Sequence, residues 1–271
     1  MVRFTQGGKN GLNLGLEGKV ALVSAASQGL GRAVAKELAQ EGAKVAIFSR
    51  DSQQIQQTAE EIALQTNGEV AAWQGDVSRI NDIRRVVHDV AARWGHIHIL
   101  VCNSGGPPSG PFTSFDDAAW QWAFENNLLS VVRLVREVLP YMTEGGRILA
   151  IASSSVKQPI PGLVLSNTMR AGVAGLMKTL AEELAPHGIL VNTVCPGRIA
   201  TNRLKELDRA RAELEETSVE EIRKSIMAKI PIGRYGEPEE FARVVTFLAS
   251  EANTYITGTT LLIDGGMVKA L

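Results

Sequence analysis

Residues 19–31, KVALVSAASQGLG, decide the fold together with the RAVAKELAQEGAKVAIFSR that follows them. Residues 20–23 form an apolar run that is too short for a helix and has a β-branched residue at each end, which predicts a buried strand. Residues 24–31 are small and polar and predict a turn. The apolar residues after the turn recur at helical spacing until Gly42 ends the helix. Residues 43–48 predict a second strand, which completes one β-α-β unit.

A turn that contains glycine, placed between a buried strand and a helix N-terminus, predicts a site for a pyrophosphate. The backbone N–H groups of such a turn approach a phosphate closely, and the helix dipole favours negative charge at that end. Tight packing of a strand against a helix also requires glycine without any ligand. The turn alone therefore does not distinguish a pyrophosphate site from close packing without a ligand, and the rest of the sequence is needed.

The composition is that of an ordinary soluble globular protein. Of the 271 residues, 45% are hydrophobic and 21% are charged, and the formal net charge is −1. This charge gives no electrostatic basis for binding nucleic acid or an anionic membrane. No apolar run reaches membrane-spanning length, and residues 1–15 show no targeting pattern. Cys102 and Cys195 each end an apolar run, which predicts buried free thiols in a reducing compartment, and we expect a cytoplasmic protein.

Strand and helix patterns alternate along the rest of the chain. Further strands are expected at residues 69–73, 97–101, 147–152, 189–194 and 260–263, and further helices at about 51–66, 78–94, 116–142, 162–185 and 238–250. No second composition regime and no internal repeat is present. The pattern predicts a single α/β domain with a Rossmann-type, doubly wound parallel sheet.

Two segments stand apart from this alternation. Residues 1–16 predict an N-terminal arm, which leaves residues 17–271 as the nucleotide-binding domain. Residues 201–229 are highly charged and carry apolar residues at helical spacing. They predict a lid over the ligand site or, alternatively, a solvated helical excursion.

In a sheet of this kind, ligands bind beyond the carboxyl ends of the strands, where the strand order reverses. The segments that leave those ends are residues 24–31, 49–50, 75–77, 103–106, 153–157 and 196–201. We therefore expect the functional residues within these segments.

Taken together, the segments resemble the short-chain dehydrogenase/reductase family, from about Leu16 to Gly266. SAASQGLG at 24–31 is similar to the family's TGxxxGxG turn, with Ala25 in place of the first glycine. The other matching motifs are GDV at 75–77, CNSG at 102–105, the asparagine of ENNLLS at Asn127, PGRIAT at 196–201 and GTTLLIDGG at 258–266. Within the family, the chain is similar to the 3-oxoacyl carrier-protein reductases.

The resemblance implies a nicotinamide cofactor held by residues from these motifs. They are Ser24, Ser27, Gln28, Gly29, Leu30, Gly31, Ser49, Arg50, Asp76, Val77, Asn103, Gly105, Arg170, Pro196, Gly197, Ile199 and Thr201. In the family, the acid of the GDV segment meets the adenine. A basic residue at the end of the second strand accommodates a 2′-phosphate, so Arg50 predicts NADP(H) rather than NAD(H). Asp51 is expected to cap the next helix.

The family's active-site signature is altered in this chain. Its common form has a catalytic serine, followed on the next helix by Tyr-x-x-x-Lys. Ser153 stands at the serine position, whereas Ser166 and Arg170 stand at the tyrosine and lysine positions, in LSNTMRAGVAGL. The resemblance implies that Arg170 binds the nicotinamide ribose and that Asn127 holds a neighbouring carbonyl group or water.

These replacements change the supply of the proton. A serine hydroxyl is a far poorer acid than a phenol of pKa ~10, and a permanently charged arginine stabilises an oxyanion without delivering a proton. Loss of a positioned general acid typically costs ~10²–10⁴ in rate. We hypothesise that Lys157, or a water held by Ser166 and Arg170, supplies the proton. The alternative for Lys157 is a solvated loop lysine.

Three functions follow from these observations. The first is an NADP(H)-dependent oxidoreductase that transfers a hydride between nicotinamide and a small-molecule carbonyl or alcohol, with Ser153, Ser166, Arg170, Asn127 and Lys157 as the catalytic candidates. The second is a catalytically weak or inactive nucleotide-binding or scaffold protein. The third is a non-redox enzyme similar to the halohydrin dehalogenases, but these keep the tyrosine and lose the nucleotide turn, whereas this chain does the opposite.

The remaining expectations concern metals, subunits and the pocket. The four histidines show no metal-ligand spacing, so no metal is predicted. The resemblance implies that the helices at 116–142 and 162–185 form the oligomer surfaces of a homodimer or homotetramer. The glycine- and proline-rich loop at 104–115 and the segment at 201–229 are expected to form the substrate pocket.

Overall fold

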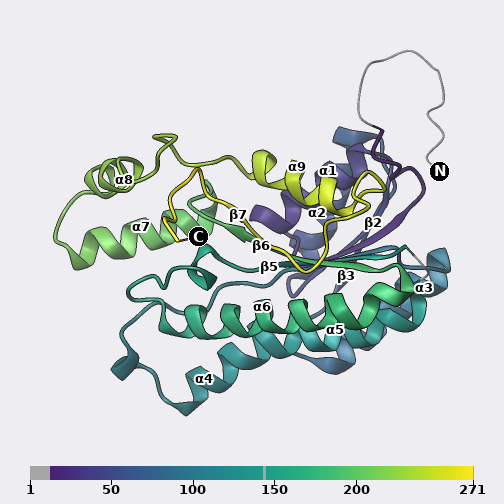
Figure 1. Ribbon diagram of the computed structural model, residues 1–271, viewed down its shortest axis with the longest axis horizontal. Helices are drawn as coiled ribbons and strands as arrows, with labels where there is room; N and C mark the ends of the chain where they lie inside the picture. Colours follow the sequence, from purple (N-terminus) through teal and green to yellow (C-terminus); the bar gives the residue numbers. More distant parts are fainter. Residues whose placement is uncertain (1–12, 143–144, 271) are drawn as a thin grey trace.

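The computed structural model describes residues 13–142 and 145–270, and a parallel sheet forms its centre (Figure 1). In the described part, the sheet has seven strands in the order β3-β2-β1-β4-β5-β6-β7. The strands are β1 (Val20–Ser24), β2 (Lys44–Ser49), β3 (Val70–Gln74), β4 (Ile99–Cys102), β5 (Arg147–Ile151), β6 (Leu190–Pro196) and β7 (Thr260–Ile263). All neighbouring strands pair in parallel. The order reverses between β1 and β4, as the doubly wound prediction requires.

Helices cover both faces of the sheet. Figure 1 shows α1 (Gly29–Gln40), α2 (Ser52–Thr66) and α9 (Pro238–Ala249) above it, and α3 (Ile80–Trp94), α5 (Ser130–Val138) and α6 (Val164–Leu184) below it. Each layer encloses its own apolar core. The predicted strands and helices are confirmed, and their ends differ from the expected ones by a few residues.

The strand β1 shows why these apolar runs become strands. Successive side chains of a strand point to opposite faces of the sheet, so a strand covered on both faces must be apolar throughout. Ala21 and Val23 belong to the core on one face, whereas Val20 and Leu22 belong to the core on the other. All of β1 is buried.

The helix predicted over residues 116–142 is confirmed, but it is not α-helical throughout. The chain forms α4 (Asp117–Phe124), a π-helical turn (Glu125–Leu129), then α5, and finally a short 3₁₀ turn (Leu139–Tyr141). A π-turn inserts one extra residue into a helix and shifts the direction of the side chains that it carries. The apolar spacing of the sequence continues through the turn, so periodicity alone does not reveal it.

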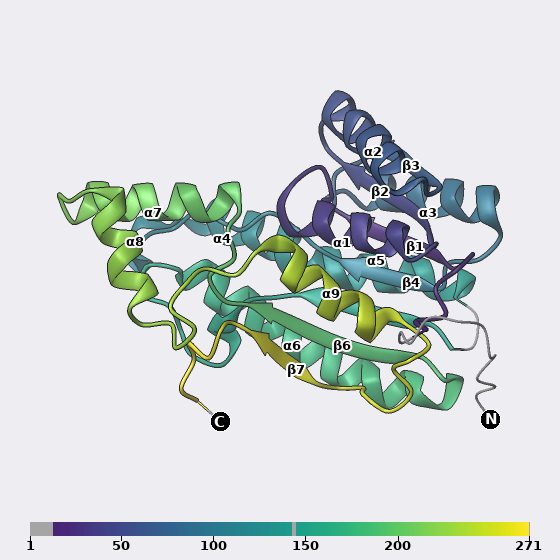
Figure 2. The ribbon, with the colours of Figure 1, turned by 90° about the horizontal axis from the view of Figure 1, so that it is seen from above.

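The segment predicted as a lid forms two helices beyond the carboxyl ends of the strands. These are α7 (Asn202–Leu214) and α8 (Val219–Met227), and Figure 2 shows them at one end of the molecule. Their inner faces share a small apolar core with Tyr235, whose hydroxyl donates to the buried Asp208 at 2.9 Å. The segment is therefore a packed structure and not a solvated excursion.

The N-terminal segment joins the core before β1. Residues 1–12 of the expected arm lie outside the described residues, but Leu16 is 2% exposed and packs in the core with α9. The carbonyl of Leu14 accepts from the backbone N–H of Glu251 at 2.9 Å. Among the described residues, none of the helices has the length and apolar character needed to cross a bilayer.

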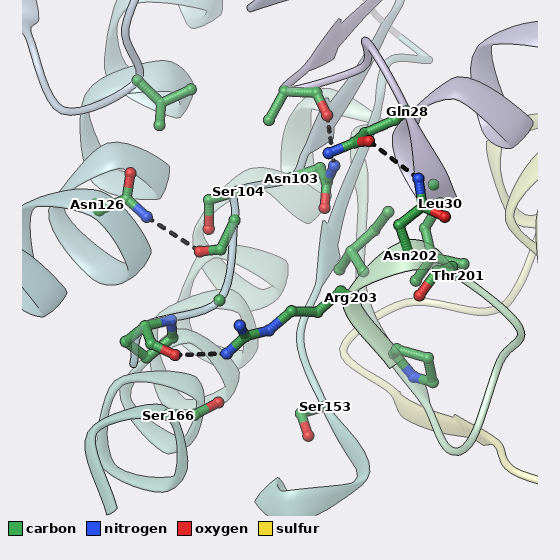
Figure 3. Close-up of a pocket in the computed structure, with 18 of the residues that line it drawn as sticks. Gln28, Leu30, Asn103, Ser104, Asn126, Ser153, Ser166, Thr201, Asn202 and Arg203 are labelled. Carbon is green, nitrogen blue, oxygen red and sulfur yellow. Dashed lines mark hydrogen bonds between the residues drawn. The ribbon is translucent and has the colours of Figure 1, made fainter. Parts of the chain in front are cut away.

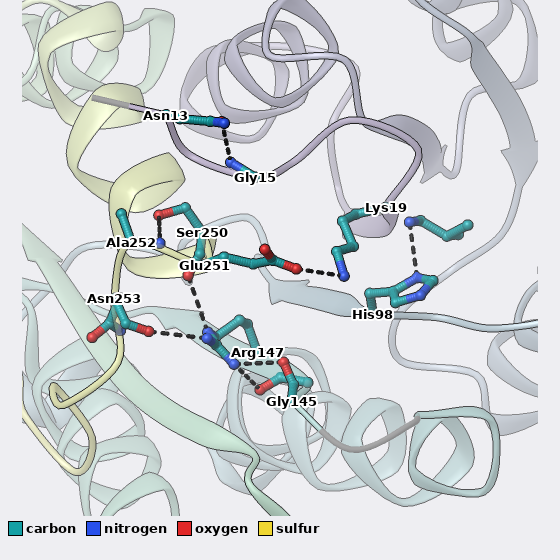
Figure 4. A network of polar contacts seen from close by, with 12 residues as sticks. Asn13, Gly15, Lys19, His98, Gly145, Arg147, Ser250, Glu251, Ala252 and Asn253 are labelled. Atoms are coloured by element: carbon teal, nitrogen blue, oxygen red, sulfur yellow. Dashed lines mark hydrogen bonds and ion pairs between the residues drawn. The ribbon is translucent and has the colours of Figure 1, made fainter. Parts of the chain in front are cut away.

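The amino ends of the strands carry a polar network, opposite the expected site (Figure 4). The guanidinium group of Arg147 is buried and donates to the carbonyls of Ser250 at 3.3 Å and Asn253 at 2.9 Å. The Nδ1 atom of His98 accepts from the Val20 backbone N–H at 3.0 Å. Arg147 connects the start of β5 to the segment after α9, and His98 connects the residue before β4 to the start of β1. His98 therefore has a structural role.

Candidate active site

A pocket of about 480 Å³ lies at the carboxyl ends of the strands, where the strand order reverses. This volume is typical of a small-molecule site. The turn after β1, the end of β2, the loop after β4, the ends of β5 and β6, and helices α6 and α7 all contribute to its wall. Figure 3 shows the pocket with the side chains that project into it.

The turn after β1 presents its backbone to the pocket. Ser27, Gln28, Gly29 and Leu30 line it. Gln28 is the N-cap of α1, and within the described residues its side chain makes no capping hydrogen bond. The first N–H groups of a helix have no partner within the helix, so an uncapped N-terminus at a pocket wall is a site for an anion.

Two residues of the predicted cofactor set support this turn from behind and do not line the pocket. Ser24 Oγ donates to the Asn103 carbonyl at 2.7 Å and accepts from the Asn103 N–H at 2.8 Å. A Cβ atom on Gly31 would lie 2.7 Å from Asn103 Nδ2 and 2.8 Å from the Ala25 carbonyl oxygen. The close approach of α1 to β4 therefore depends on glycine at position 31.

Ala25, which the resemblance matched to the family's first glycine, has a backbone conformation that is unusual for alanine. Its φ angle is 48°, in the left-handed region that few residues other than glycine adopt. Its carbonyl accepts from Asn103 Nδ2 at 3.0 Å. This hydrogen bond links the turn to the loop after β4 and holds the conformation in place.

The end of β2 supplies the predicted basic residue. Ser49 and Arg50 line the pocket, and Arg50 is exposed. Asp51 caps α2 by accepting from the Gln54 N–H at 2.9 Å, which confirms the capping prediction. The cation at position 50 is therefore available to a ligand, because the neighbouring carboxylate has a different partner.

The GDV segment lies at the pocket in part. Gly75 and Val77 line the wall, but Asp76 does not. Its carboxylate accepts from the Ser78 N–H at 2.9 Å and the Ser78 hydroxyl at 2.8 Å, and these bonds close the turn before α3. The structure does not bring this acid into the pocket wall.

The opposite wall carries three of the predicted catalytic residues. Ser153 follows β5, and Ser166 and Arg170 lie four residues apart on α6, hence on one face of the helix. Ser153 Oγ accepts from the Ser155 N–H at 3.1 Å. Its own proton is left to donate, whereas Ser166 Oγ makes no hydrogen bond to the other described residues. Figure 3 shows both serines in the same part of the pocket.

Arg170 is a buried cation that contacts only neutral groups among the described residues. Its guanidinium group donates to the Ile151 carbonyl at 2.8 Å and, at 3.4 Å, to the carbonyl and hydroxyl oxygens of Ser104. Burial lowers the pKa of Arg170 to about 10. The side chain therefore remains charged at neutral pH and gives the pocket wall a fixed positive charge.

Two consecutive asparagines of the π-turn, Asn126 and Asn127, donate hydrogen bonds to the loop after β4. Asn127 is fully buried and donates to the Gly105 carbonyl at 2.7 Å and to Ser104 Oγ at 2.9 Å, while its Oδ1 has no partner in the described part of the chain. Asn126 donates to the same carbonyl at 3.0 Å and lines the pocket. Asn127 thus acts one layer behind the wall. Sequence analysis missed Asn126, because an α-helix would turn it away.

Lys157 does not enter the pocket. Its side chain is exposed, and it follows the 3₁₀ turn Ser154–Val156, which carries the chain away from the pocket wall. This position favours the alternative of a solvated loop lysine over the hypothesis that Lys157 supplies the proton. The lining residues in the described part include neither a lysine nor a tyrosine.

Most other predicted residues meet at this pocket. Those that line it are Ser27, Gln28, Gly29, Leu30, Ser49, Arg50, Val77, Asn103, Gly105, Ser153, Ser166, Arg170, Pro196, Gly197, Ile199 and Thr201. Those that do not are Ser24, Gly31, Asp76, Asn127 and Lys157. Sequence analysis also missed Arg203, which reaches from α7 to the Pro107 carbonyl at 2.7 Å. The one sequence signal for Arg203 was its position in the charged segment at residues 201–229.

Both cysteines are buried free thiols, as predicted. Burial raises the pKa of Cys195 to about 11, so its thiol is protonated at neutral pH. Burial raises the pKa of the Cys102 thiol further. Within residues 13–142 and 145–270, no group of three or more histidine, cysteine or acidic side chains could hold a metal ion.

The strand order and the turn at the reversal point define the class as a Rossmann-type nucleotide-binding fold. A family model described as "Enoyl-(Acyl carrier protein) reductase" matches residues 24–268. The relatives and solved structures that match most of the chain include short-chain dehydrogenases/reductases. The chain belongs to the short-chain dehydrogenase/reductase family.

Similar proteins in the family act on different compounds. The 3-oxoacyl-[acyl-carrier-protein] reductase of Thermotoga maritima is 34% identical over 255 residues, which cover 93% of this chain and 99% of the relative. The L-sorbose reductase of Gluconobacter frateurii, solved with NADPH and L-sorbose, superimposes with a TM-score of 0.91 at 30% identity, covering 96% of this chain and all of the other. An actinorhodin polyketide ketoreductase solved with NADPH has a TM-score of 0.89 at 33% identity, covering 92% and 97%.

Proposed function

We propose that this protein is an NADP(H)-dependent oxidoreductase that interconverts a carbonyl compound and its alcohol. The observation that carries the proposal is one continuous pocket that joins the uncapped N-terminus of α1 to Ser153, Ser166 and Arg170. Two similar proteins were solved with NADPH, and the relatives named above are reductases of carbonyl compounds. Family membership supports the class of reaction, and the pocket residues support its details.

The residues at the turn fit a dinucleotide. The N–H groups of Gly29 and Leu30 would hold the pyrophosphate, because the first turn of α1 lacks a capping side chain. Arg50, at the end of β2, would pair with a 2′-phosphate, which favours NADP(H) over NAD(H). A Cβ atom at Gly31 would push α1 away from β4, so the cradle depends on that glycine.

The bound nicotinamide would supply or accept the hydride, and the protein's side chains would manage the substrate oxygen. Ser153 would donate its free hydroxyl proton in a hydrogen bond to that oxygen. Arg170 would stabilise developing negative charge and hold the ribose, because burial keeps its guanidinium group in one place. Asn127 would position the Gly105 carbonyl beside the site.

The proton would come from a water held between Ser166 and Arg170. Ser166 Oγ is half-buried and has no hydrogen-bond partner among the described residues, so it can bind a water in the pocket. Lys157 is exposed and outside the pocket wall. Of the two donors that the sequence suggested, the geometry favours the water.

A second function is a nucleotide-binding protein with weak or no turnover. It is favoured by one observation: neither a phenol nor an ammonium group lines the described pocket, so the usual proton donor of the family has no counterpart there. Such a protein would bind NADPH through the same turn and would act through its α7–α8 segment or its subunit surfaces.

Fluorescence titration with NADPH, followed by NADPH oxidation across a panel of ketones, aldehydes and oxo acids, separates the two functions. Binding with turnover that depends on Ser153 supports the oxidoreductase. Binding without turnover on any member of the panel supports the second function. Failure to bind NADPH, or tighter binding of NADH, contradicts the cofactor assignment.

We propose a homodimer or homotetramer formed through residues 116–142 and 162–185, on the basis of the family resemblance. We also propose that the protein is cytoplasmic, on the basis of its two free thiols. The part of the expected arm that the structure describes packs on the core, through Leu16. Light scattering during size-exclusion chromatography would give the subunit number. A monomeric mass would contradict the assembly.

A further inference from the structure

The pocket has two ends, and their charges differ. We call the residues after β4 and on α4, the π-turn, α6 and α7 the substrate end; they include Pro107, Trp122, Asn126, Leu163, Ser166, Arg170, Arg203, Leu204 and Leu207. In the described chain, both ionisable side chains of this end are arginines. Among the described lining residues, the one carboxylate is that of Asp51, which lies at the other end and caps α2.

Arg203 reaches across the substrate end from α7. Its Nη2 atom donates to the Pro107 carbonyl at 2.7 Å, and Figure 3 shows the side chain extended towards the loop after β4. Its Nε atom would lie 3.4 Å from a Cβ atom on Gly106. A neutral carbonyl satisfies one N–H of a group that has five, so most of the donors of Arg203 are free for a ligand.

The charged neighbour of Arg203 in the described chain is Glu206. The two side chains lie 3.5 Å apart on α7, but Glu206 is 63% exposed and does not line the pocket. An exposed pair of this kind contributes little to stability and is screened by salt. The cation therefore remains available to an anion that enters the pocket and displaces the contact with Pro107.

Four apolar side chains also line the substrate end. Leu163, Leu204, Leu207 and Trp122 line it beside the arginines. A ligand that fits has an apolar body and one anionic group opposite Arg203. A carboxylate matches the planar fork of a guanidinium group and carries a single charge. A phosphate dianion would bring a second negative charge towards Glu206.

We propose that the substrate is an oxo acid or hydroxy acid whose carboxylate pairs with Arg203 while its carbonyl or alcohol oxygen contacts Ser153. This inference rests on the proposed function. In the reductive direction, the hydride adds to the carbonyl carbon, the C=O π bond breaks, and a proton from water adds to the oxygen. NADPH is oxidised to NADP⁺, and the carboxylate is unchanged.

The test measures ligand binding, so it can be carried out before the substrate is identified. Calorimetry of the full-length protein saturated with NADP⁺ compares hexanoate with hexanamide, which has the same body without the charge. We expect hexanoate to bind at least about tenfold more tightly than hexanamide. This factor corresponds to the lower end of the contribution that a hydrogen bond to a charged group makes. Arg203→Gln should remove that preference. Arg203→Lys should retain part of it.

Arg209→Gln is the matched control, because Arg209 is an exposed arginine on the same helix that does not line the pocket. It should keep the preference for hexanoate. Kinetics with 2-oxo and 3-oxo acids of four to eight carbons and their methyl esters then extend the test. Arg203→Gln should lower kcat/KM for the acids by ~10–100-fold and change that of the esters by less than ~3-fold.

Several results would overturn the inference. These are equal binding of hexanoate and hexanamide, a preference that survives Arg203→Gln, or a phosphorylated ketone that is preferred to every acid. Weaker NADPH binding by Arg203→Gln would also overturn it, by assigning Arg203 to the cofactor. Failure of NADPH to bind the unmodified protein is a separate outcome, which contradicts the proposed function itself.

Discussion

The two ends of the pocket are built from different parts of the protein. We call the part of the pocket formed by the turn after β1 and the end of β2 the nucleotide end. It presents backbone and small side chains beside Arg50, and behind it Gly31 packs closely against Asn103 and the Ala25 carbonyl. At the substrate end, long side chains such as Trp122, Arg170 and Arg203 reach the pocket from α4, α6 and α7, opposite the loop after β4. A site built from backbone groups cannot change unless the fold around it changes too. A site built from side chains can change while the sheet beneath it stays the same.

This difference explains how the architecture is kept with serine and arginine at positions 166 and 170. Both residues lie in the first two turns of α6, where the helix reaches the pocket, and the same face packs on the sheet further along through Val173, Met177 and Ala181. A change at position 166 or 170 leaves those three core residues in place. Predictions for the substrate end therefore concern rate and affinity, whereas those for the nucleotide end also concern stability.

The largest effect is expected for Ser153→Ala. It removes the hydroxyl that we place against the substrate oxygen, and loss of one such donor costs ~10²–10³ in kcat. NADPH affinity, measured by fluorescence titration, should change by less than ~3-fold. Ser225→Ala, on the exposed face of α8, is the control and should behave like the unmodified protein. A loss below fivefold in kcat would remove Ser153 from the proposed mechanism.

The next effect is expected for Arg50→Ala, at the opposite end of the pocket. Loss of a charge-assisted pair with a 2′-phosphate should weaken NADPH binding by ~10–100-fold. NADH lacks that phosphate, so its affinity is the internal control and should change little. Isothermal titration of both cofactors measures the difference. Equal weakening of both would show that Arg50 supports the fold and does not read the phosphate.

Gly31→Ala should act mainly on stability. Its Cβ atom would lie 2.7 Å from Asn103 Nδ2 and 2.8 Å from the Ala25 carbonyl oxygen, and relief of such contacts typically costs ~1–3 kcal/mol of unfolding free energy. Gly175→Ala is the matched control, because nothing lies within 4 Å of its added Cβ on α6. It should be neutral or stabilising. Urea denaturation followed by circular dichroism would measure both; an unchanged midpoint for Gly31→Ala would contradict the close packing.

The smallest effect is expected for Lys157→Met. The side chain is exposed and outside the pocket wall, so kcat should change by less than twofold at every pH between 6 and 9. Steady-state kinetics between pH 6 and 9 would measure this with the substrate that the panel identifies. A loss of tenfold or more would make Lys157 a candidate proton donor again and would require the segment after β5 to move.

Most of the fold could be predicted from local patterns. The strand at residues 260–263 and the cap at Asp51 match the structure, because buried runs and capping residues act over a few neighbours. The π-turn at Glu125–Leu129 could not be predicted. Its stability comes from contacts that its asparagines make with Gly105, about twenty residues earlier in the chain, and no local spacing carries that information.

The candidate site divides in the same way. The turn at Ser27–Leu30 could be located from its sequence, because its function belongs to the backbone. Arg203 could not, because its importance depends on a long side chain that reaches the loop after β4 from a helix almost one hundred residues away. Asp76 and Lys157 stand in the expected segments, but their side chains turn away from the pocket wall. Sequence motifs locate segments more reliably than they orient side chains.

The buried guanidinium group of Arg170 has a consequence for the stability of the ligand-free protein. Burial lowers its pKa to about 10, so at every pH below that value the charged form is held less favourably in the folded chain than in the unfolded one. This unfavourable contribution is constant at lower pH and shrinks as the pH rises through the pKa of Arg170, where the folded chain releases a proton that the unfolded chain still binds. A protein selected for folding alone would carry an apolar side chain there. On the proposed function, the Arg170 cation lowers the free energy of unfolding and in return places a fixed positive charge beside the ligand.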